Sequence, residues 1–572
     1  MFKLIKFIKG HTAAAVIAPL CKLVEAIFEL AVPMIIANVI DVGVAAGDKK
    51  YVLTYCIVIA ALAVTGFAIS VTGQYLASKV GLGFGTRLRA AVFGHMNKLP
   101  LSSSDKIGTS SLVTRITGDV MNCQNAVNMF LRLVLRIPFV LIGAFVMSMI
   151  IDPVLSLMFL AMTVVLGATI SCVLKFTLPR VRRAQKNLDE LSRLSAQSLT
   201  GARVIRAFSK QSDAQAEFDS AASATAETNI AAARISTLLN PLTFAVVNLA
   251  IIAVLWFGGN KINAGALSQG EIVALINYLT QAFFIIVTIG NVFTIFTRSA
   301  ACAARVNEIL DAPVPEDGTL ELDASALEDG DEVLRFDNVS FAYDGDYDVR
   351  NISFTLGYNG TLGVIGGTGS GKSTIVALAE RFYEPAEGGI YFCGKPARDY
   401  KAAAMRGQIG FVPQRAAVLC GTLDLNLRVA DESVTTEREI FALQTAQASE
   451  LISSHGLDGE IAAGGKNLSG GQRQRVGIAR ALCRDNVLYL FDDSTSALDY
   501  KTEREFMTAM RAVPGAKMYV SQRISAVSGC DNILVLDGGR IVGYGTHAEL
   551  KNTCPLYAEF CASQQGSSGE AS

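Results

Sequence analysis

The hydrophobic and polar positions divide the chain into two halves with different patterns. Six long apolar stretches with few charged positions occupy the first half, at residues 13–40, 52–76, 127–151, 153–173, 240–258 and 272–296. As a helix, each stretch is long enough to cross about 30 Å of hydrocarbon, because an α-helix rises about 1.5 Å per residue. Beyond residue 333, short apolar runs of strand length alternate with helical patterns. The pattern therefore predicts six transmembrane helices followed by an α/β domain.

The connections between the six stretches differ in length and in charge. Three short turns contain only Lys49, Lys50 and Lys261 as cations, whereas the second and third stretches are separated by about 50 residues and the fourth and fifth by over 60, with many Lys and Arg. Lysine and arginine are enriched in cytoplasmic loops. We therefore expect a multi-pass protein of the cell (plasma) membrane, with both termini, both long connections and the α/β domain in the cytoplasm. The helical pattern of the long connections also predicts that the spans continue as helices beyond the bilayer.

Charge is unevenly distributed, although the net charge is only −1. Residues 1–310 carry 27 Lys and Arg against 15 Asp and Glu, and residues 311–572 carry 23 against 36. An acidic second half argues against nucleic acid as a partner. The eleven cysteines form no C-x-x-C pair and there are only four histidines, so we expect no zinc site.

Composition also predicts the domain boundaries. The stretch after residue 311 has acidic residues, two prolines and no Lys or Arg up to residue 332, as in a solvated linker. The last nine residues are rich in Gly and Ser and are predicted to be disordered. The predicted division is a transmembrane domain at 1–311, a linker at 312–332, an α/β domain at 333–563 and a tail at 564–572.

Charged residues also occur inside the apolar stretches. Glu25 and Glu29 share one face of the first stretch, Lys22 precedes Glu25 by one turn, and Arg132 and Arg136 open the third. Ionisable residues inside a membrane often indicate function. The alternative is that such residues neutralise one another within the bundle, as an i, i+3 pair of Lys22 and Glu25 would. The second interpretation is favoured except for Glu29, for which both remain open.

The most specific motif is a glycine-rich loop between an apolar strand and a helix. It fits the pattern G-x-x-x-x-G-K-[ST] of a phosphate-binding loop. Its residues, predicted to bind ATP, are Gly366, Gly367, Thr368, Gly369, Ser370, Gly371, Lys372, Ser373 and the following Thr374. The glycines allow backbone N–H groups to surround phosphates at a helix N-terminus. Lys372 is expected to reach the β- and γ-phosphates, and the Ser373 hydroxyl to bind Mg²⁺.

Two further motifs follow the phosphate loop. An apolar strand at residues 488–492 ends in Asp492, a second predicted Mg²⁺ ligand. About 20 residues earlier comes the sequence LSGGQ, formed by Leu468, Ser469, Gly470, Gly471 and Gln472. With these motifs, the chain resembles an ATP-binding cassette (ABC) exporter half-transporter along nearly its whole length. The implied fold class is a six-span α-helical transmembrane domain of exporter type fused to an α/β P-loop nucleotide-binding domain.

The resemblance implies roles for further residues. Tyr343 would stack on adenine, and Gln414 would sense Mg²⁺ and the γ-phosphate; their alternatives are an ordinary strand aromatic and a turn residue. Ser496, Ala497, Leu498 and Asp499 resemble the loop that crosses the dimer interface. Two coupling helices are expected near residues 110–119 and 201–209. In this family each ATP, with Mg²⁺, lies between the phosphate loop of one chain and the LSGGQ of another, so a second half-transporter is required.

The chain departs from the family pattern at two positions. Asp493 stands where the family has the glutamate that polarises water, and Gln522 stands where it has a histidine that contacts the γ-phosphate. Shortening the side chain by one methylene withdraws the carboxylate by about 1 Å, which can cost on the order of a hundredfold in rate. Glutamine can donate a hydrogen bond but cannot carry a positive charge. The alternative is that Asp493 still works, slowly, through an adjusted water.

These departures lead to a specific expectation. The chain is predicted to be the degenerate-site subunit of a heterodimeric bacterial exporter of small amphipathic molecules, of the drug, lipid or peptide class. Its LSGGQ would complete a competent ATP site on a partner that carries Glu and His. The alternatives are a homodimeric exporter or lipid flippase, an importer on the exporter fold, and a nucleotide-gated regulatory subunit. ATP-dependent movement of a substrate in vesicles would separate transport from regulation.

Overall fold

The computed structural model describes residues 2–315, 317–322 and 327–565. It divides into two compact units, Met1–Asn97 with Thr109–Ala312, and Lys98–Gly108 with Pro313–Ser572. Parts of the predicted linker and most of the predicted tail lie outside the described residues.

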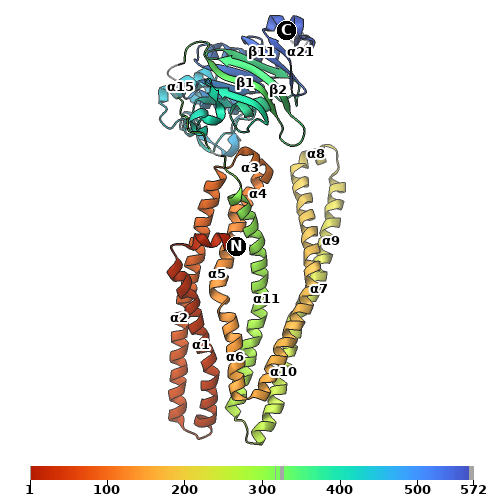
Figure 1. The fold of residues 1–572 in the computed structure, drawn as a ribbon. Coiled ribbons are helices and arrows are strands. Elements are labelled where there is room, and N and C mark those ends of the chain that lie inside the picture. The colour runs from red at the N-terminus through yellow and green to blue at the C-terminus, as the bar shows by residue number, and fades with distance from the viewer. Residues whose placement is uncertain (1, 316, 323–326, 566–572) are drawn as a thin grey trace. The chain divides into compact units, whose positions relative to one another are not determined.

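The first unit is entirely helical (Figure 1). Its elements are η1 (Phe2–Ile8), α1 (Thr12–Asn38), η2 (Val39–Val44), α2 (Lys49–Met96), α4 (Thr109–Thr114), η3 (Arg115–Asp119), α5 (Val120–Leu133), α6 (Arg136–Ile151), α7 (Pro153–Thr200), α8 (Ala202–Ala207), α9 (Gln211–Thr237), α10 (Leu239–Asn263) and α11 (Gln269–Asp311). Within the described residues, six helical segments are long and apolar enough to cross a membrane. The six predicted spans are confirmed.

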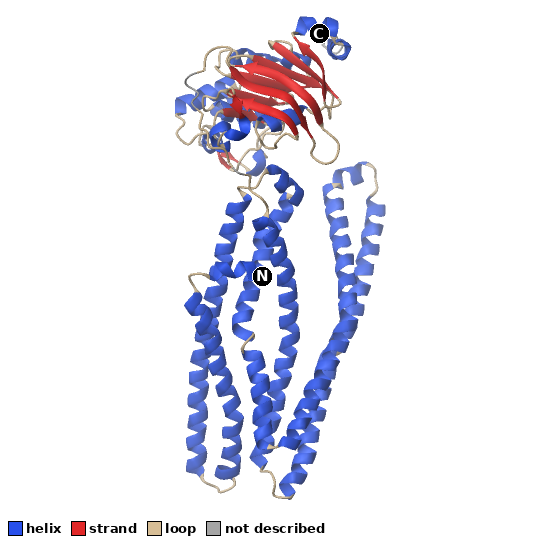
Figure 2. Cartoon of the chain, in the orientation of Figure 1, coloured by secondary structure: helices blue, strands red, loops and turns tan. Residues whose placement is uncertain are grey.

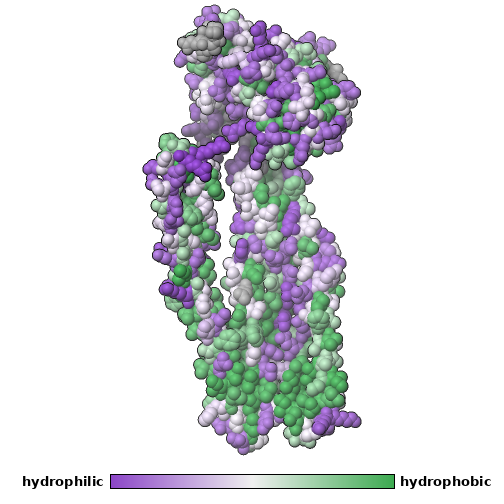
Figure 3. All heavy atoms as spheres, turned by 180° about the vertical axis from the view of Figure 1, so that it is seen from behind, coloured by the Kyte–Doolittle hydropathy of each residue, from purple (hydrophilic) through white to green (hydrophobic). Residues whose placement is uncertain are grey.

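The spans extend beyond the thickness of a bilayer, as the pattern of the long connections predicts. The 48 residues of α2 and the 48 of α7 each correspond to about 72 Å of helix, more than twice the hydrocarbon thickness. Apolar side chains gather in one band near the end of the helices that lies in the lower part of Figure 3. Exposed Val64, Phe67 and Trp256 are examples of side chains that suit a lipid environment.

The third span is interrupted between α5 and α6, at residues 134–135. Pro138 lies four residues after Val134, and a proline has no N–H to donate to the carbonyl of that residue. The interruption lies between Arg132 and Arg136, the two cations that open the apolar stretch. Nearby, Tyr278 of α11 is fully buried and donates a hydrogen bond of 2.7 Å to the Leu30 carbonyl of α1.

The second unit contains sheets covered by helices (Figure 2). Its elements are α3 (Leu101–Ile107), β1 (Glu332–Phe341), β2 (Val349–Gly357), β3 (Thr361–Gly366), α12 (Lys372–Ala379), β4 (Glu387–Phe392), β5 (Lys395–Pro396), η5 (Ala397–Asp399), α13 (Ala402–Arg406), β6 (Ile409–Val412), β7 (Gly421–Thr422), α14 (Leu423–Arg428), α15 (Thr436–Thr445), α16 (Ser449–His455), β8 (Glu460–Ile461), η6 (Ala463–Gly465), α17 (Gly470–Leu482), β9 (Leu488–Asp492), α18 (Tyr500–Met510), β10 (Ala516–Ser521), α19 (Ile524–Val527), β11 (Asn532–Asp537), β12 (Arg540–Gly545), α20 (His547–Thr553) and α21 (Pro555–Gln565).

The main sheet has the strand order β12-β11-β3-β10-β9-β6, in which all pairs except β11–β12 are parallel. A smaller antiparallel sheet has the order β2-β1-β4-β5. Parallel strands are usually covered on both faces, which matches their continuous apolar runs. The predicted fold class, six helical spans with an α/β nucleotide-binding domain, is confirmed.

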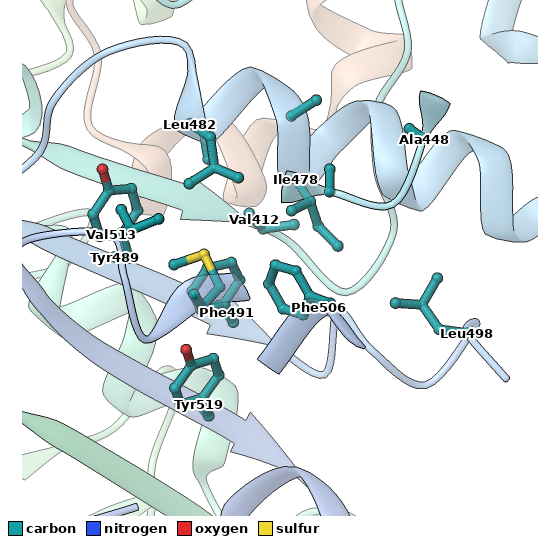
Figure 4. Packing of buried hydrophobic residues seen from close by; sticks show 14 of the residues in the cluster. Val412, Ala448, Ile478, Leu482, Tyr489, Phe491, Leu498, Phe506, Val513 and Tyr519 are labelled. Carbon is teal, nitrogen blue, oxygen red and sulfur yellow. The ribbon is translucent and has the colours of Figure 1, made fainter. Parts of the chain in front are cut away.

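Aromatic packing anchors one face of the main sheet (Figure 4). The ring of Phe491 on β9 stacks on Tyr519 of β10 with centroids 5.1 Å apart, and it meets Phe506 of α18 edge-on at 5.5 Å. Offset-stacked and edge-on pairs are the favoured arrangements of aromatic rings. This packing fixes β9, whose last residue is Asp492, against the helices that follow it.

The first long connection contributes a segment to the second unit. Lys98–Gly108 belongs to this unit, and the Asp105 carboxylate accepts a hydrogen bond from the Tyr383 hydroxyl. The segment lies ahead of the predicted coupling position at 110–119, which belongs to the first unit. Sequence pattern did not reveal the difference, because α3 and α4 are separated only by Gly108, at φ +80°.

The stretch predicted to be a solvated linker packs on the second unit where it is described. Leu320 forms a parallel bridge with Tyr400, and its N–H donates to the Asp399 carbonyl. The Glu321 carboxylate pairs with Lys401 at 2.6 Å. The acidic charge of this segment is therefore partly used in contacts with the domain that follows it.

Candidate functional site

The topology of the main sheet gathers the predicted ATP-binding residues at one edge. The phosphate loop follows β3, Gln522 follows β10, Asp492 ends β9 and Gln414 comes two residues after β6. These four strands are neighbours and run parallel, so their carboxyl ends meet at the same edge. Residues separated by more than 150 positions in sequence thus converge through strand order alone.

The phosphate loop has the backbone that its glycines permit. Gly369 and Gly371 have φ values of +78° and +93°, in the region that side chains other than glycine rarely adopt. A Cβ at Gly371 would lie 2.6 Å from Cγ1 of Val349, so even alanine would clash there. The Lys372 ammonium donates hydrogen bonds to the carbonyls of Gly366 (2.9 Å) and Gly367 (2.7 Å). Burial lowers the pKa of Lys372, while the nearby Asp493 and Asp492 act in the opposite direction.

Two predicted Mg²⁺ ligands are in direct contact. The Ser373 hydroxyl donates a hydrogen bond of 3.0 Å to Oδ1 of Asp492. Burial raises the pKa of Asp492, and the bond from Ser373 opposes this rise. A hydroxyl and a carboxylate are the oxygen ligands that Mg²⁺ prefers beside nucleotide phosphates. The residues therefore fit a magnesium nucleotide: Ser373, Asp492 and the predicted third ligand, Gln414, would hold the ion, which supplies charge neutralisation at the phosphates.

Asp493 adopts a constrained backbone conformation. Its φ is +46°, and its N–H donates a hydrogen bond of 2.8 Å to the Val520 carbonyl of β10. Its Oδ2 accepts a hydrogen bond of 3.4 Å from the side-chain amide of Gln414, while its buried Oδ1 makes no hydrogen bond. Burial raises the pKa of Asp493, and the amide of Gln414 opposes the rise. Asp493 and Gln414 are thus brought together at the site.

Gln522 directly follows β10, the strand next to β9, and its backbone lies close to this carboxylate. Its side chain is exposed, and its backbone N–H is close enough to lower the pKa of Asp493 in part. Its carbonyl accepts a hydrogen bond of 2.8 Å from the Gln564 side chain of α21. Gln564 falls in the predicted disordered tail, yet α21 extends to Gln565. The predicted tail beyond residue 565 lies outside the described residues.

Tyr343 lies on an aromatic cluster near the phosphate loop. Its ring meets Phe341 edge-on with centroids 4.9 Å apart and Tyr383 edge-on at 5.0 Å. Its side chain retains 44% exposure, so one part of the ring is free to contact a ligand. Burial raises the pKa of the Tyr343 hydroxyl, and a hydrogen bond with the Thr374 side chain opposes this rise. The position suits the predicted contact with adenine.

The LSGGQ segment forms the beginning of α17. The Ser469 hydroxyl caps the helix by accepting a bond of 3.2 Å from the Gln472 N–H, and the Gln472 side chain accepts from the Ser469 N–H at 2.8 Å. Leu468 is buried, which anchors the segment. Gly470 and Gly471 follow at the positive end of the helix dipole, where anions bind. Within the described residues, no hydrogen bond or ion pair joins this segment to the phosphate loop.

Residues 496–499 form a braced turn after β9. The Ser496 hydroxyl donates a hydrogen bond of 2.7 Å to the Asp493 carbonyl, and Asp499 caps α18 by accepting from the Thr502 N–H at 3.2 Å. The side chain of Leu498 is buried, and the Ala497 carbonyl lies close to Gly471 of the LSGGQ segment. The guanidinium of Arg523 also contacts this turn. The sequence analysis missed Arg523, whose only signal is its place after Gln522.

Four charged residues of the first and third spans form ion pairs, whereas Arg132 donates a hydrogen bond to the Gln74 side chain. The Lys22 ammonium lies 2.6 Å from the Glu25 carboxylate, as the i, i+3 spacing predicts, and it also donates to the Ser70 hydroxyl. Arg136 pairs with Glu29 at 2.8 Å. Glu29 therefore has a structural partner on the third span, which the sequence did not identify.

Comparison with known proteins identifies the family of both halves of the chain. A model of the ABC transporter transmembrane region matches residues 15–286, and a model of the ABC transporter family matches residues 349–496. An uncharacterized ABC transporter ATP-binding protein of Mycobacterium tuberculosis is 34% identical over 556 residues, covering 95% of this chain and 94% of the relative. An ATP-dependent lipid A-core flippase of Hahella chejuensis is 31% identical over 503 residues, covering 86% and 84%.

A solved structure has a similar fold. A bacterial Atm1-family ABC exporter with ATP bound superposes with a TM-score of 0.80 at 25% identity, covering 97% of this chain and 98% of the other. ABC exporters act as dimers, and their ABC domains bind and hydrolyse ATP. The chain therefore belongs to the ABC transporter family and is an ABC exporter, a multi-pass protein of the plasma membrane whose cytoplasmic nucleotide-binding domain is an ATPase coupled to transport.

Proposed function

We propose that this exporter chain is the degenerate-site half of a heterodimer. The observation that carries the proposal is the pair Asp493 and Gln522, which directly follow the adjacent strands β9 and β10, at the two positions that act on the γ-phosphate by resemblance to the family. The chain's own phosphate loop would bind ATP and hydrolyse it slowly. Its LSGGQ segment would complete a fast site on a partner with Glu and His at the corresponding positions.

The surroundings of Asp493 support slow hydrolysis. Its backbone is fixed by a positive φ and by the bond to the Val520 carbonyl. The carboxylate therefore cannot advance by the length of the missing methylene unless the end of β9 moves. A displacement of about 1 Å can cost on the order of a hundredfold in rate.

The character of Gln522 supports the same conclusion. Its amide can donate one hydrogen bond to a phosphate oxygen, but it adds no positive charge where negative charge accumulates. Its side chain is exposed, and among the described residues it makes no hydrogen bond. The two departures act on the same phosphate, so their effects combine.

The rest of the ATP machinery argues against a chain that has lost nucleotide function. The phosphate loop keeps Lys372 and Ser373, and the reciprocal Ser469–Gln472 cap preserves the start of α17. An intact LSGGQ segment would be of no use to the chain's own site, because in this family it serves the ATP of a partner. The combination of a weakened own site and a preserved segment for the partner's site favours an asymmetric dimer.

The proposed cargo is a small amphipathic molecule of the drug, lipid or peptide class. The spans are largely apolar, and their charged residues Lys22, Glu25, Glu29 and Arg136 are occupied with one another. The relative named as a lipid A-core flippase supports a lipid-like cargo. A homodimeric exporter or flippase is the alternative that this relative favours.

The experiment is isolation of the affinity-tagged chain from native membranes, followed by identification of its stoichiometric partner. The proposal predicts a second half-transporter with Glu and His at the positions of Asp493 and Gln522. Recovery of the chain only as a homodimer would contradict it. Reconstitution of the purified complex in vesicles then tests transport: ATP-dependent movement of an amphipathic dye supports export, whereas its absence despite ATP-dependent closure would favour a regulatory subunit.

A further inference from the structure

Arg523 joins two functional segments that are adjacent in space but not in sequence. One guanidinium nitrogen donates a hydrogen bond of 3.1 Å to the Leu498 carbonyl, and another donates one of 2.9 Å to the Ser496 carbonyl. Both carbonyls belong to the turn that begins at Asp493. Arg523 itself follows Gln522 directly, in a loop that we call the switch loop, residues 521–524. A single side chain thus connects the Gln522 loop to the Asp493 turn.

We propose that Arg523 is a positioning residue that sets the Asp493 turn according to the position of the switch loop. It acts through residues 496 and 498 and not on the nucleotide. The inference rests on the predicted role of the Asp493 turn at ATP, but it does not depend on whether the partner is a second copy or a different chain.

Hydrogen bonds connect the two segments, so that a displacement of the switch loop changes the Asp493 turn. The Asp493 N–H donates to the Val520 carbonyl at 2.8 Å, and the Ser496 hydroxyl returns to the Asp493 carbonyl at 2.7 Å. Arg523 holds the far end of this turn. The Asp493 turn is therefore fixed at its start by β10 and at its end by Arg523, the residue after Gln522. Movement of Gln522 relative to β10 would consequently change the conformation of this turn.

The switch loop is anchored on its opposite side by α21. The Gln564 side chain donates to the Gln522 carbonyl at 2.8 Å and accepts from the Ile524 N–H at 2.8 Å. These two bonds straddle Arg523 and fix the backbone from which its side chain extends. The position of the Arg523 guanidinium relative to Ser496 and Leu498 is therefore fixed by these hydrogen bonds.

The chemistry of the site requires arginine. A guanidinium presents several N–H donors in a planar fork and can hold two carbonyls at once, whereas a lysine ammonium on a flexible stem cannot match both positions. The buried Glu503 lies 3.9 Å from the guanidinium and the Tyr500 ring lies 5.3 Å from it, so both favour the cation at this position. Glu503 accepts a further hydrogen bond from Ser525, which fixes its carboxylate.

The test uses the full-length transporter purified with its native partner. Arg523→Met removes the donors and keeps much of the apolar stem, Arg523→Lys keeps the charge, and Arg504→Met is the matched control, an exposed arginine of α18. The measurements are kcat, the Kd of a fluorescent ATP analogue, and hydrogen exchange of the amides at residues 493–499. Arg523→Met is expected to lower kcat about tenfold or more, because residues 496–499 resemble the loop that crosses the dimer interface, and a group displaced at the partner's ATP is costly. Exchange at residues 493–499 should rise about tenfold, with the Kd within about twofold of wild type.

Arg523→Lys should recover only part of kcat and of exchange protection, and Arg504→Met should match wild type. Unchanged exchange at residues 493–499 in Arg523→Met overturns the proposal, whatever happens to kcat. A parallel loss of ATP binding and kcat would mean that Arg523 acts on the nucleotide or on folding, which also overturns it. If no preparation hydrolyses ATP, the transport function fails, and the exchange measurement still decides the role of Arg523.

Discussion

The side-chain amide of Gln414 donates a hydrogen bond of 3.4 Å to Oδ2 of Asp493, across the carboxyl ends of β6 and β9. The other carboxylate oxygen is buried without a hydrogen bond. Oδ2 is thus held by one long side-chain bond, and the backbone N–H of Gln522 lies close to the carboxylate. Oδ1 has no hydrogen-bond partner to orient it. This geometry connects the sequence departure at residue 493 to a physical expectation of slow turnover.

Removal of the Lys372 ammonium tests the phosphate loop. In the Asp493→Glu/Gln522→His variant, whose own site is expected to be competent, Lys372→Ala should reduce ATP hydrolysis about a hundredfold, because a preorganised cation at the transferred phosphoryl group is lost. Lys395→Ala, at an exposed position of β5, is the matched control and should leave turnover unchanged. Turnover and ATP binding should be measured together. Equal turnover of the Asp493→Glu/Gln522→His variant with and without Lys372→Ala would refute the assignment of the loop.

Substitution of Tyr343 tests the adenine contact. Tyr343→Ala should raise the Kd for ATP about tenfold, because stacking of a base on an aromatic ring contributes roughly 1–3 kcal/mol. Tyr343→Phe should bind like wild type, since it keeps the ring. Tyr347→Ala removes an exposed tyrosine that is bonded to Glu387 and serves as the control. An unchanged Kd in Tyr343→Ala would show that Tyr343 is an ordinary aromatic residue that makes no contact with adenine.

Glu380, at the end of α12, should make stability depend on pH. Burial raises its pKa to about 8, although Arg406 and Arg484 oppose the rise. The folded protein therefore keeps a proton that the unfolded chain loses near pH 4.5. The stability from this group is fully present below about pH 4.5 and is lost as the pH rises towards about 8, with a slope of up to about 1.4 kcal/mol per pH unit.

The measurement is the melting temperature of the purified protein between about pH 5 and 9, a range that covers most of the interval over which the stability contributed by Glu380 is lost. Glu380→Gln should flatten the fall that wild type shows with increasing pH, because a neutral amide does not titrate. Glu384→Gln, whose side chain is 55% exposed, is the control and should keep the wild-type slope. Parallel slopes for Glu380→Gln and wild type would show that Glu380 is ionised in the fold.

The pair of Glu29 and Arg136 is expected to stabilise the bundle of spans. Glu29→Gln leaves Arg136 without its partner at 2.8 Å, and it should cost about 2 kcal/mol. This is less than the roughly 3–5 kcal/mol of a fully buried pair, because both side chains remain partly exposed. The double variant Glu29→Gln/Arg136→Gln should regain most of the loss. Thermal stability in detergent is the measurement, and equal stability of Glu29→Gln and wild type would favour a functional role for Glu29.

The elements that local sequence determines were predictable. Six apolar stretches give six spans, and the spacing of Gly366, Gly371 and Lys372 gives a loop between β3 and α12. Asp492 and Gln414 were assigned from motifs, and strand order then brings them together. These features depend on residues that are close in sequence or on a pattern repeated along one element.

Features that depend on contacts between distant residues were not predictable. The pairing of Arg136 with Glu29 spans 107 positions, and no spacing rule indicates it. The contact of Gln564 with the switch loop lies in a stretch whose Gly/Ser composition suggested a tail. Lys98–Gly108 joins the second unit because of the contacts of α3, which composition does not encode. Each case requires knowledge of which surfaces meet.

The central claim is most directly tested by the ATPase turnover of this chain purified alone, beside the variant Asp493→Glu/Gln522→His. The account predicts a nearly inactive wild type and an active double variant, because the longer carboxylate and the imidazole restore contacts with water and the γ-phosphate. The Lys372→Ala derivative of the double variant should abolish the gained activity, which ties it to this site. Equal turnover of the wild type and the double variant would contradict a degenerate site and favour a homodimeric exporter.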